Sequence, residues 1–338
     1  MTVTETATGC RDIAAQLTTP GKGILAADES ISTMSSRLEQ AGVEPTEESR
    51  RTYRELLAST PGLADGISGI IFCEETLNQV FSDGRSFPQA VAEMGILSGI
   101  KVDTGAKPCP GLPGETITEG LDGLPARLAH YAEIGATFAK WRAVITITDK
   151  SPSWGAIAAN ANALARYAAA CQDAGVVPIV EPEVLMTGSH TIARCADVTA
   201  SVHAAVRQQL SLLNVDLAGI VLKPNMVIEG EDCPQQSTPA EVAAATVRVL
   251  RAWPAELAGV AFLSGGQPPE RATANLEALQ HHQTPWPLTF SFGRALVSPA
   301  LAAWHGDETL VAAGQTALGS HVAANAAAVR LRADLQSA

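Results

Sequence analysis

Charged side chains stand at six points where an apolar run of this sequence ends. A solvated rim position or a structural ion pair explains any one of them as readily as chemistry does. Burying unpaired ions is costly, however, and a fold has little reason to repeat that cost six times. We therefore interpret the six points as one functional cluster: Asp28, Lys101 with Asp103, Lys140 with Arg142, Glu181 with Glu183, Lys223 and Arg294.

Two of these lysines are candidate nucleophiles. A lysine held among apolar groups and other cations is driven toward the neutral amine, which can attack a carbonyl and form a Schiff base. Lys223 suits this role because it follows Gly-Ile-Val-Leu and precedes Pro224, at the end of a predicted buried strand. Lys140 would then disfavour the charge on Lys223. Spacing alone does not decide which lysine is the nucleophile.

The carboxylates supply the proton transfers that Schiff-base chemistry needs. Loss of water from the carbinolamine requires an acid that later acts as a base, and Glu181 is placed to be that group. Carbon–carbon cleavage needs a base for the hydroxyl that becomes an aldehyde, and Asp28 is available. We expect Glu183 to keep the protonation states of its neighbours matched. On a strand, residues two apart share a face, so Lys140 points with Arg142, and Glu181 with Glu183.

Two groups of residues have the features of phosphate sites. Small residues and arginines at strand-to-helix junctions let backbone N–H groups and a planar guanidinium reach an anion. The first group comprises Ser264, Gly265, Gly266 and Arg294, and the second comprises Ser30, Ser32, Thr33 and Arg37 near Lys101. Two such sites on either side of a reactive lysine predict a bisphosphorylated substrate.

Eight short apolar segments have the character of buried strands, and helix-length segments lie between most of them. The segments are 23–28, 67–72, 95–102, 137–145, 176–184, 218–224, 259–265 and 288–292. Near-continuous apolar strands alternating with amphipathic helices predict an α/β fold, a TIM (β/α)8 barrel. Extra N-terminal helices are expected at 9–18 and about 34–58. The segment after the second strand, 72–84, has no obvious helix.

Composition narrows the class of protein. The 338 residues carry a net charge of −12, which argues against nucleic-acid and anionic-membrane partners. We find no linker, so residues 1–338 are expected to form one domain. The N-terminus lacks a secretion signal and no run is long enough to span a membrane, so we expect a cytoplasmic protein. The six cysteines are scattered, and the seven histidines are interpreted as ordinary surface residues in helices or loops, so no metal and no cofactor is predicted.

Seven motifs, in order along the chain, closely resemble those of class I fructose-1,6-bisphosphate aldolases. They are GKGILAADES (21–30), GIKVD (99–103), FAKWRAV (138–144), IVEPEVL (179–185), LKPNMV (222–227), FLSGGQ (262–267) and SFGRAL (291–296). The resemblance implies a metal-independent lyase of glycolysis and gluconeogenesis, acting on a sugar bisphosphate and triose phosphates, and typically a homotetramer.

The resemblance also implies roles for individual residues. It makes Lys223 the Schiff-base lysine and Glu181 the group that serves dehydration, while Asp28, Lys140 and Glu183 share proton transfer and charge stabilisation. Its phosphate contacts are Ser264, Gly265 and Arg294 for the 1-phosphate, and Ser30, Thr33 and Lys101 for the 6-phosphate, with Arg37 and Arg142 nearby.

Some positions depart from the animal members of the family. Thr33, Ser36 and Thr104 replace a serine and two lysines, so an altered affinity for the 6-phosphate is expected. Nothing aromatic follows Trp304, where those members carry a tyrosine that assists proton exchange. The preference between fructose 1-phosphate and the bisphosphate is therefore open.

Three other functions compete with this interpretation. A metal-dependent aldolase would need clustered imidazole ligands, which the histidine positions do not suggest. A different Schiff-base lyase is a chemical alternative, because the loops of a barrel set its chemistry. A scaffold protein that retains the barrel without turnover would be marked by loss of the reactive lysine or its acid, and both are present.

Overall fold

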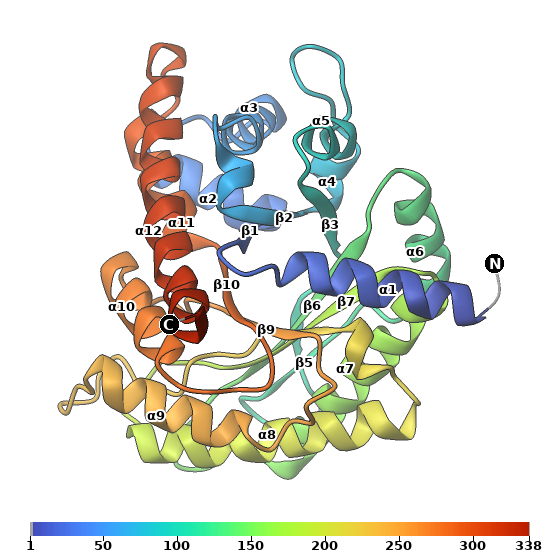
Figure 1. Cartoon of the computed structure of the whole chain (residues 1–338), viewed down its shortest axis with the longest axis vertical. Coiled ribbons are helices and arrows are strands. Elements are labelled where there is room, and N and C mark those ends of the chain that lie inside the picture. Colours follow the sequence, from blue (N-terminus) through green and yellow to red (C-terminus); the bar gives the residue numbers. More distant parts are fainter. Residues whose placement is uncertain (1–2, 338) are drawn as a thin grey trace.

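Eight parallel strands close into a barrel at the centre of the molecule (Figure 1). The computed structural model describes residues 3–337, and their side chains from 9 to 331. Around the barrel the strand order is β1-β10-β9-β8-β7-β6-β3-β2. The bounds are β1 Gly23–Ala27, β2 Ile67–Phe72, β3 Leu97–Lys101, β6 Phe138–Ile145, β7 Val177–Val184, β8 Val221–Leu222, β9 Gly259–Phe262 and β10 Leu288–Phe292. The predicted TIM barrel is confirmed.

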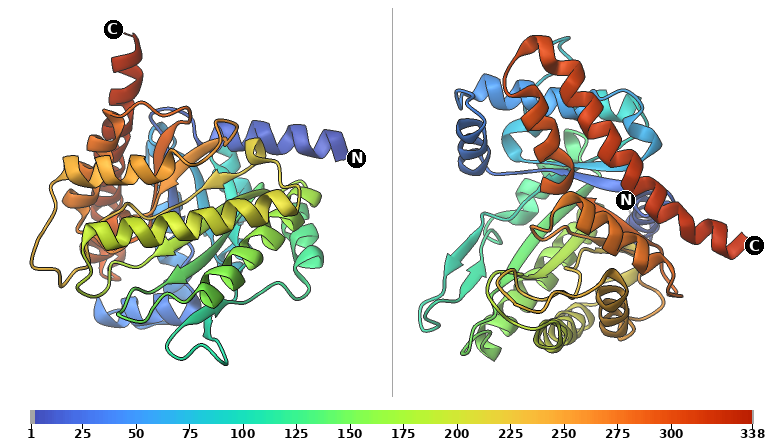
Figure 2. Two further views of the ribbon diagram at one scale, coloured as in Figure 1. Left: turned by 90° about the horizontal axis from the view of Figure 1, so that it is seen from below. Right: turned by 90° about the vertical axis from the view of Figure 1, so that its left-hand side faces the viewer.

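Helices surround this barrel. They are α1 Val3–Leu17, α2 Ile31–Gln40, α3 Glu47–Ala58, α4 Glu74–Leu77, α5 Phe87–Glu93, α6 Leu124–Glu133, α7 Trp154–Asp173, α8 Ile192–Leu212, α9 Pro239–Leu250, α10 Pro269–Gln280, α11 Arg294–Trp304 and α12 Val311–Ser337. Short 3-10 turns lie at Leu63–Asp65, Leu217–Gly219 and Glu308–Leu310. Both views in Figure 2 show the end of α12 extending away from the barrel.

Apolar side chains fill both sides of the barrel wall. A large cluster lies between the strands and the surrounding helices. A smaller cluster joins inward-facing strand residues, among them Ile24, Phe138 and Ile179, to Cys10, Ala14 and Leu17 of α1. Helix α1 therefore packs on the apolar inside of the barrel. Because apolar groups occupy that end, the charged residues are left to the other end of the strands.

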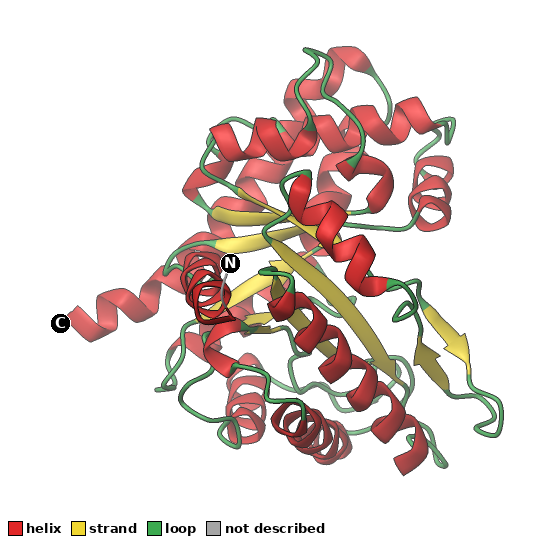
Figure 3. Cartoon of the chain, turned by 90° about the vertical axis from the view of Figure 1, so that its right-hand side faces the viewer, coloured by secondary structure: helices red, strands yellow, loops and turns green. Residues whose placement is uncertain are grey.

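The structure differs from the predicted elements in three places. The expected helix at about 34–58 is two helices, α2 and α3, because Gly42 takes a φ of 76° between them. The segment 72–84, in which no helix was obvious, contains the short helix α4, and α5 follows it. A hairpin of β4 Ala106–Pro108 and β5 Thr116–Thr118 was not predicted, since strands of three residues carry too little pattern to detect. Figure 3 shows this hairpin projecting beside the barrel.

The expectation that all histidines are surface residues is wrong for His203. This residue is 2% exposed, and its Nδ1 accepts a hydrogen bond of 3.2 Å from Trp253 Nε1. Burial lowers the pKa of His203 to about 3 and keeps the ring neutral. A buried neutral imidazole with an indole donor is a packing residue, which its position within α8 did not reveal. No helix in the described part of the chain has the length and apolar character needed to cross a membrane.

Candidate active site

A cavity of about 550 Å³ opens at the end of the barrel where the strands finish. All but one of the site residues named from the sequence line it, and the exception is Gly266. They come from the segment after β1 and the helix α2 that follows it, from β3, β6 and β7, from the residue after β8, from the loop after β9 and from the start of α11. Closure of the barrel brings these strand ends together, although they are spread over more than 260 residues of sequence.

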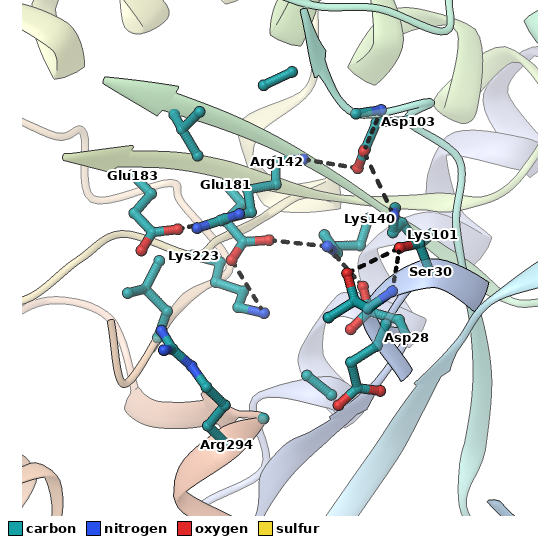
Figure 4. A pocket seen from close by; sticks show the side chains of 18 of the residues that line it. Asp28, Ser30, Lys101, Asp103, Lys140, Arg142, Glu181, Glu183, Lys223 and Arg294 are labelled. Carbon is teal, nitrogen blue, oxygen red and sulfur yellow. Dashed lines mark hydrogen bonds and ion pairs between the residues drawn. The ribbon is translucent and has the colours of Figure 1, made fainter. Parts of the chain in front are cut away.

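Four charged side chains form a continuous chain across the cavity floor (Figure 4). Lys140 Nζ lies 2.7 Å from Asp28 Oδ2 and 3.4 Å from Glu181 Oε2. The other oxygen of Glu181, Oε1, lies 3.3 Å from Lys223 Nζ. Each of the four is at most 9% exposed. Glu181 is therefore shared between the two lysines.

Electrostatics distinguish the two lysines. Burial lowers the pKa of Lys140, but the carboxylates of Asp28, Glu181 and Asp103 more than offset this effect and raise it above its ordinary value. For Asp28 the directions are reversed. Burial raises the pKa of this carboxyl, but the positive charges of Lys140 and Lys223 lower it to about 2. Lys140 and Asp28 are thus held as a charged pair. An ammonium kept protonated is a poor nucleophile, so the geometry favours Lys223 over Lys140.

Local backbone contacts fix Lys223 in place. Strand β8 covers only Val221–Leu222, but the N–H of Lys223 donates to the Val180 carbonyl of β7 at 2.8 Å. The next residue, Pro224, has no N–H to continue the ladder. The lysine therefore stands just after β8, held to β7 by its own N–H, and its Nζ lies 3.3 Å from Glu181 Oε1.

A second ion pair lies toward the mouth of the cavity. Arg142 Nε is 2.5 Å from Glu183 Oε2. The backbone N–H of Arg142 also donates to Asp103 Oδ2 at 3.2 Å, and Asp103 Oδ1 lies 3.9 Å from Lys101 Nζ. The charged pairs of β3, β6 and β7 are thus joined to one another. Asp103, seen in the sequence as a strand-end charge but not assigned a role, connects them.

The N-terminus of α2 faces the cavity with a row of hydroxyls. Ser30 caps the helix, and its Oγ accepts from the Thr33 N–H at 3.3 Å. The same Oγ lies 3.0 Å from Thr33 Oγ1 and 3.1 Å from Ser32 Oγ. Helix N-termini favour anions, and Lys101 lines the same cavity. In Figure 4, Ser30 and Lys101 lie on the side of Lys223 opposite Arg294.

On that other side, the first residue of α11 is Arg294, which follows β10 and Gly293. Ser264 and Gly265 line the cavity from the loop after β9. Burial, followed by the charges of Arg37 and Arg142, lowers the pKa of Arg294, so several guanidinium groups act on this region. Gly266 instead makes room for Arg294, because a Cβ there would lie 3.1 Å from its Nη2.

Sequence reasoning missed two kinds of contributor. Ser291 lines the cavity with its hydroxyl oxygen buried and without a hydrogen-bond partner among the described residues. Its polar side chain within an apolar strand was the available signal. Glu29 also lines the cavity and binds Arg37 and Arg54. It directly follows Asp28 in the GILAADES motif, but no spacing rule connects it to an arginine 25 residues later.

Comparisons with known proteins agree on one family. A family model described as fructose-bisphosphate aldolase class-I, glycolytic, matches residues 10–335. Fructose-bisphosphate aldolase C of Rattus norvegicus is 53% identical over 87% of this chain and 82% of its own length. A probable fructose-bisphosphate aldolase class 1 of Xanthomonas campestris pv. campestris is 51% identical over 88% and 90%.

A solved structure is similar over nearly its whole length. Fructose-bisphosphate aldolase from Plasmodium falciparum, in a ternary crystal with TRAP and a small-molecule inhibitor, superposes with a TM-score of 0.95. It is 43% identical, and the match covers 96% of this chain and 95% of that one.

Proposed function

Because this chain belongs to the class-I fructose-bisphosphate aldolase family, we propose that its barrel cavity forms the Schiff base through Lys223. The enzyme is a carbon–carbon lyase. It reversibly cleaves fructose 1,6-bisphosphate to dihydroxyacetone phosphate and glyceraldehyde 3-phosphate, a step of glycolysis and gluconeogenesis. Class I chemistry uses an amine of the protein, in place of a metal ion, to withdraw electrons from the bond that breaks.

The observation that carries the assignment is the chain Asp28–Lys140–Glu181–Lys223. The amine of Lys223 adds to the C2 carbonyl of the open-chain sugar. Glu181, 3.3 Å from that nitrogen, protonates the carbinolamine hydroxyl, which leaves as water and yields the iminium. The C3–C4 bond then breaks, and its electron pair moves into the iminium to form an enamine.

Asp28 takes the proton from the C4 hydroxyl as that carbon becomes an aldehyde. Its low pKa keeps it ionised, and Lys140 holds it in position at 2.7 Å. A proton from solvent adds to the enamine at C3 and restores the iminium. Glu181, now a carboxylate, accepts a proton from the water that attacks the iminium carbon. Collapse of the resulting carbinolamine, with transfer of its hydroxyl proton to the amine, releases dihydroxyacetone phosphate and frees Lys223. Glu183 neutralises Arg142 beside this chain and so helps to fix the charge of the site.

The two anion-binding regions fit the two ends of the substrate. We assign the 1-phosphate to Ser264, Gly265 and Arg294, with Gly266 leaving space for the guanidinium. We assign the 6-phosphate to Ser30, Thr33 and Lys101, at the N-terminus of α2. Arg37 and Arg142 add positive charge to the cavity wall.

Three broader properties are proposed from family membership. Residues 1–338 form one domain, the subunits assemble as a homotetramer, and the enzyme acts in the cytoplasm on small sugar phosphates alone. The acidic net charge of −12 supports the absence of nucleic-acid partners. Sedimentation equilibrium of the purified protein measures the subunit number.

Trapping with borohydride tests the assignment of Lys223. The protein is mixed with fructose 1,6-bisphosphate and a chelator, reduced, and mapped by peptide mass. We expect a triose-phosphate adduct on Lys223 and full activity in chelator, while Lys223→Arg loses the adduct and at least about 1,000-fold in kcat. An adduct on Lys140, or activity abolished by chelation, would overturn the assignment.

A further inference from the structure

One arginine contacts the active-site loop from behind, without reaching the cavity. Arg54 lies in α3, and its side chain is only 1% exposed. A buried guanidinium is costly unless its donors are satisfied. Its hydrogen bonds reach the last residue of β1 and the residue two positions beyond it.

The contacts of Arg54 fall on both sides of Asp28. Its Nε donates to the carbonyl of Ala27 at 2.6 Å, and its Nη2 donates to the carbonyl of Glu29 at 3.3 Å. These are the residues immediately before and after Asp28. The planar fork of the guanidinium therefore brackets the backbone of the candidate base. This fixes the point from which the Asp28 carboxylate reaches Lys140.

The guanidinium of Arg54 is also connected, through the side chain of Glu29, to the candidate phosphate-binding region. Arg54 Nη2 lies 2.7 Å from Glu29 Oε2, and the other oxygen, Oε1, lies 2.5 Å from Arg37 Nη1. Arg37 lines the cavity. One carboxylate thus joins the hidden arginine to an arginine that faces the substrate, so the position of Arg37 depends on Arg54.

We propose that Arg54 is a positioning residue of this enzyme, which sets the place of Asp28 for carbon–carbon cleavage and, through Glu29, orients Arg37 toward substrate phosphate. This inference rests on the roles proposed above for Asp28 and Arg37. It does not involve Lys223 or Glu181, because the hydrogen bonds and ion pair of Arg54 in the described part of the chain go to Ala27 and Glu29. Schiff-base formation and bond cleavage are therefore separable in Arg54 variants.

Lysine is an informative replacement because it keeps the charge but cannot present a planar fork to three acceptors. In the Arg54→Lys variant we expect borohydride to trap dihydroxyacetone phosphate on Lys223 as in the wild type. The kcat for cleavage of fructose 1,6-bisphosphate, counted per trapped site, falls by about 10- to 100-fold, the effect of a misplaced catalytic group. A purely structural defect lowers trapping and cleavage in the same proportion.

Arg50→Lys is the matched control. Arg50 lies one turn earlier on α3, is 8% exposed and also binds a carboxylate, with Nη2 2.6 Å from Glu75 Oε1, but it does not line the cavity. Its kcat per trapped site should stay within about twofold of the wild type. The wild-type protein, measured in parallel, tests the proposed function itself. If the wild type fails to form the adduct or to cleave the substrate, the assignment of Lys223 is wrong, and the result says nothing about Arg54.

An unchanged kcat per trapped site in Arg54→Lys overturns the proposal. If that variant does not fold, Glu29→Gln replaces it, since the amide keeps the side-chain volume and leaves both backbone contacts of Arg54 in place. Loss of the ionic link to Arg37 should then raise the KM for fructose 1,6-bisphosphate by at least about threefold, with trapping unchanged. A KM equal to that of the wild type would contradict the proposed coupling of Arg54 to Arg37 through Glu29.

Discussion

Lys140 illustrates how neighbouring carboxylates hold a buried lysine in its charged form. Two carboxylates contact its ammonium, at 2.7 and 3.4 Å, and they keep it charged inside the protein. A fixed cation there favours the ionised form of Asp28 and leaves the shared Glu181 as the group that meets Lys223. Both lysines are buried and both line one cavity, but two carboxylates contact Lys140 and one contacts Lys223.

The pH dependence of stability provides a test of the Asp28–Lys140 pair. The folded pKa of Asp28, about 2, lies below its ordinary value of 3.8. The pair therefore stabilises the fold above about pH 4, and this contribution is lost as the pH falls toward 2. The difference in free energy of unfolding between wild type and Asp28→Asn should be largest near neutral pH and shrink on acidification. Urea denaturation between about pH 7 and pH 3 measures it.

Asp28→Asn should also lower kcat by about 100-fold or more while leaving the borohydride adduct on Lys223 intact. A stability difference that is constant across this pH range would contradict the charged pair. A variant with normal kcat would remove Asp28 from the reaction.

At the scale of elements, close packing inside the barrel requires small residues on its strands. Gly99 of β3 and Gly69 of β2 lie against the ring of Phe138 on β6, and Gly23 of β1 lies against Phe290 on β10. A Cβ at Gly99 would overlap the Phe138 ring. Lys101 and Lys140 stand at paired positions just beyond this contact, so the packing sets the height of the catalytic strand ends.

Gly99→Ala should therefore destabilise the fold by about 1–3 kcal/mol, because the interior cannot accommodate the methyl group without displacing strands. Gly319→Ala is the control. Gly319 lies in α12 with no atom within 4 Å of an added Cβ, and the change should be neutral or stabilise by about 0.5–1 kcal/mol. Urea denaturation of both variants decides the matter, and equal midpoints would refute the packing argument.

At the scale of the whole molecule, the cavity is electrostatically unlike the rest of the protein. Seven cationic and five acidic side chains line it, while the chain as a whole carries −12. A doubly phosphorylated substrate is thus repelled by the overall field and attracted by the local one. The local field must dominate at the mouth of the cavity, since desolvated charges are screened less than exposed ones.

Ionic strength should consequently affect capture of the substrate more than its conversion. Raising NaCl from about 0.02 to 0.5 M shortens the screening length several-fold. We expect kcat/KM for fructose 1,6-bisphosphate to fall while kcat changes little, with a steeper dependence than for fructose 1-phosphate, which carries one phosphate. Initial rates with the two substrates measure the slopes. Equal slopes would argue against separate anion-binding regions at the two ends.

Much of this protein follows from local sequence. Apolar runs of strand length, alternating with helix-length segments, determine eight βα units, and eight such units close into a barrel. Two-residue periodicity places Glu181 and Glu183 on one face, and the position of Lys223 after an apolar run places it at a strand end. The motifs identify the family. These features depend on neighbours in the chain, and so the chain alone displays them.

Other features depend on which distant segments meet, and only the tertiary structure decided them. The different surroundings of Lys140 and Lys223 depend on the carboxylates that each one touches at the ends of β1 and β6 and in β7. The sequence pattern likewise did not predict the hairpin β4–β5, the close packing of Arg294 against Gly266 or the burial of His203. Arg54 is the clearest case, since its partners lie 25 to 27 residues away and no periodicity links them. Packing sets the distances between side chains on different elements, and these distances cannot be inferred from the spacing of residues along the sequence.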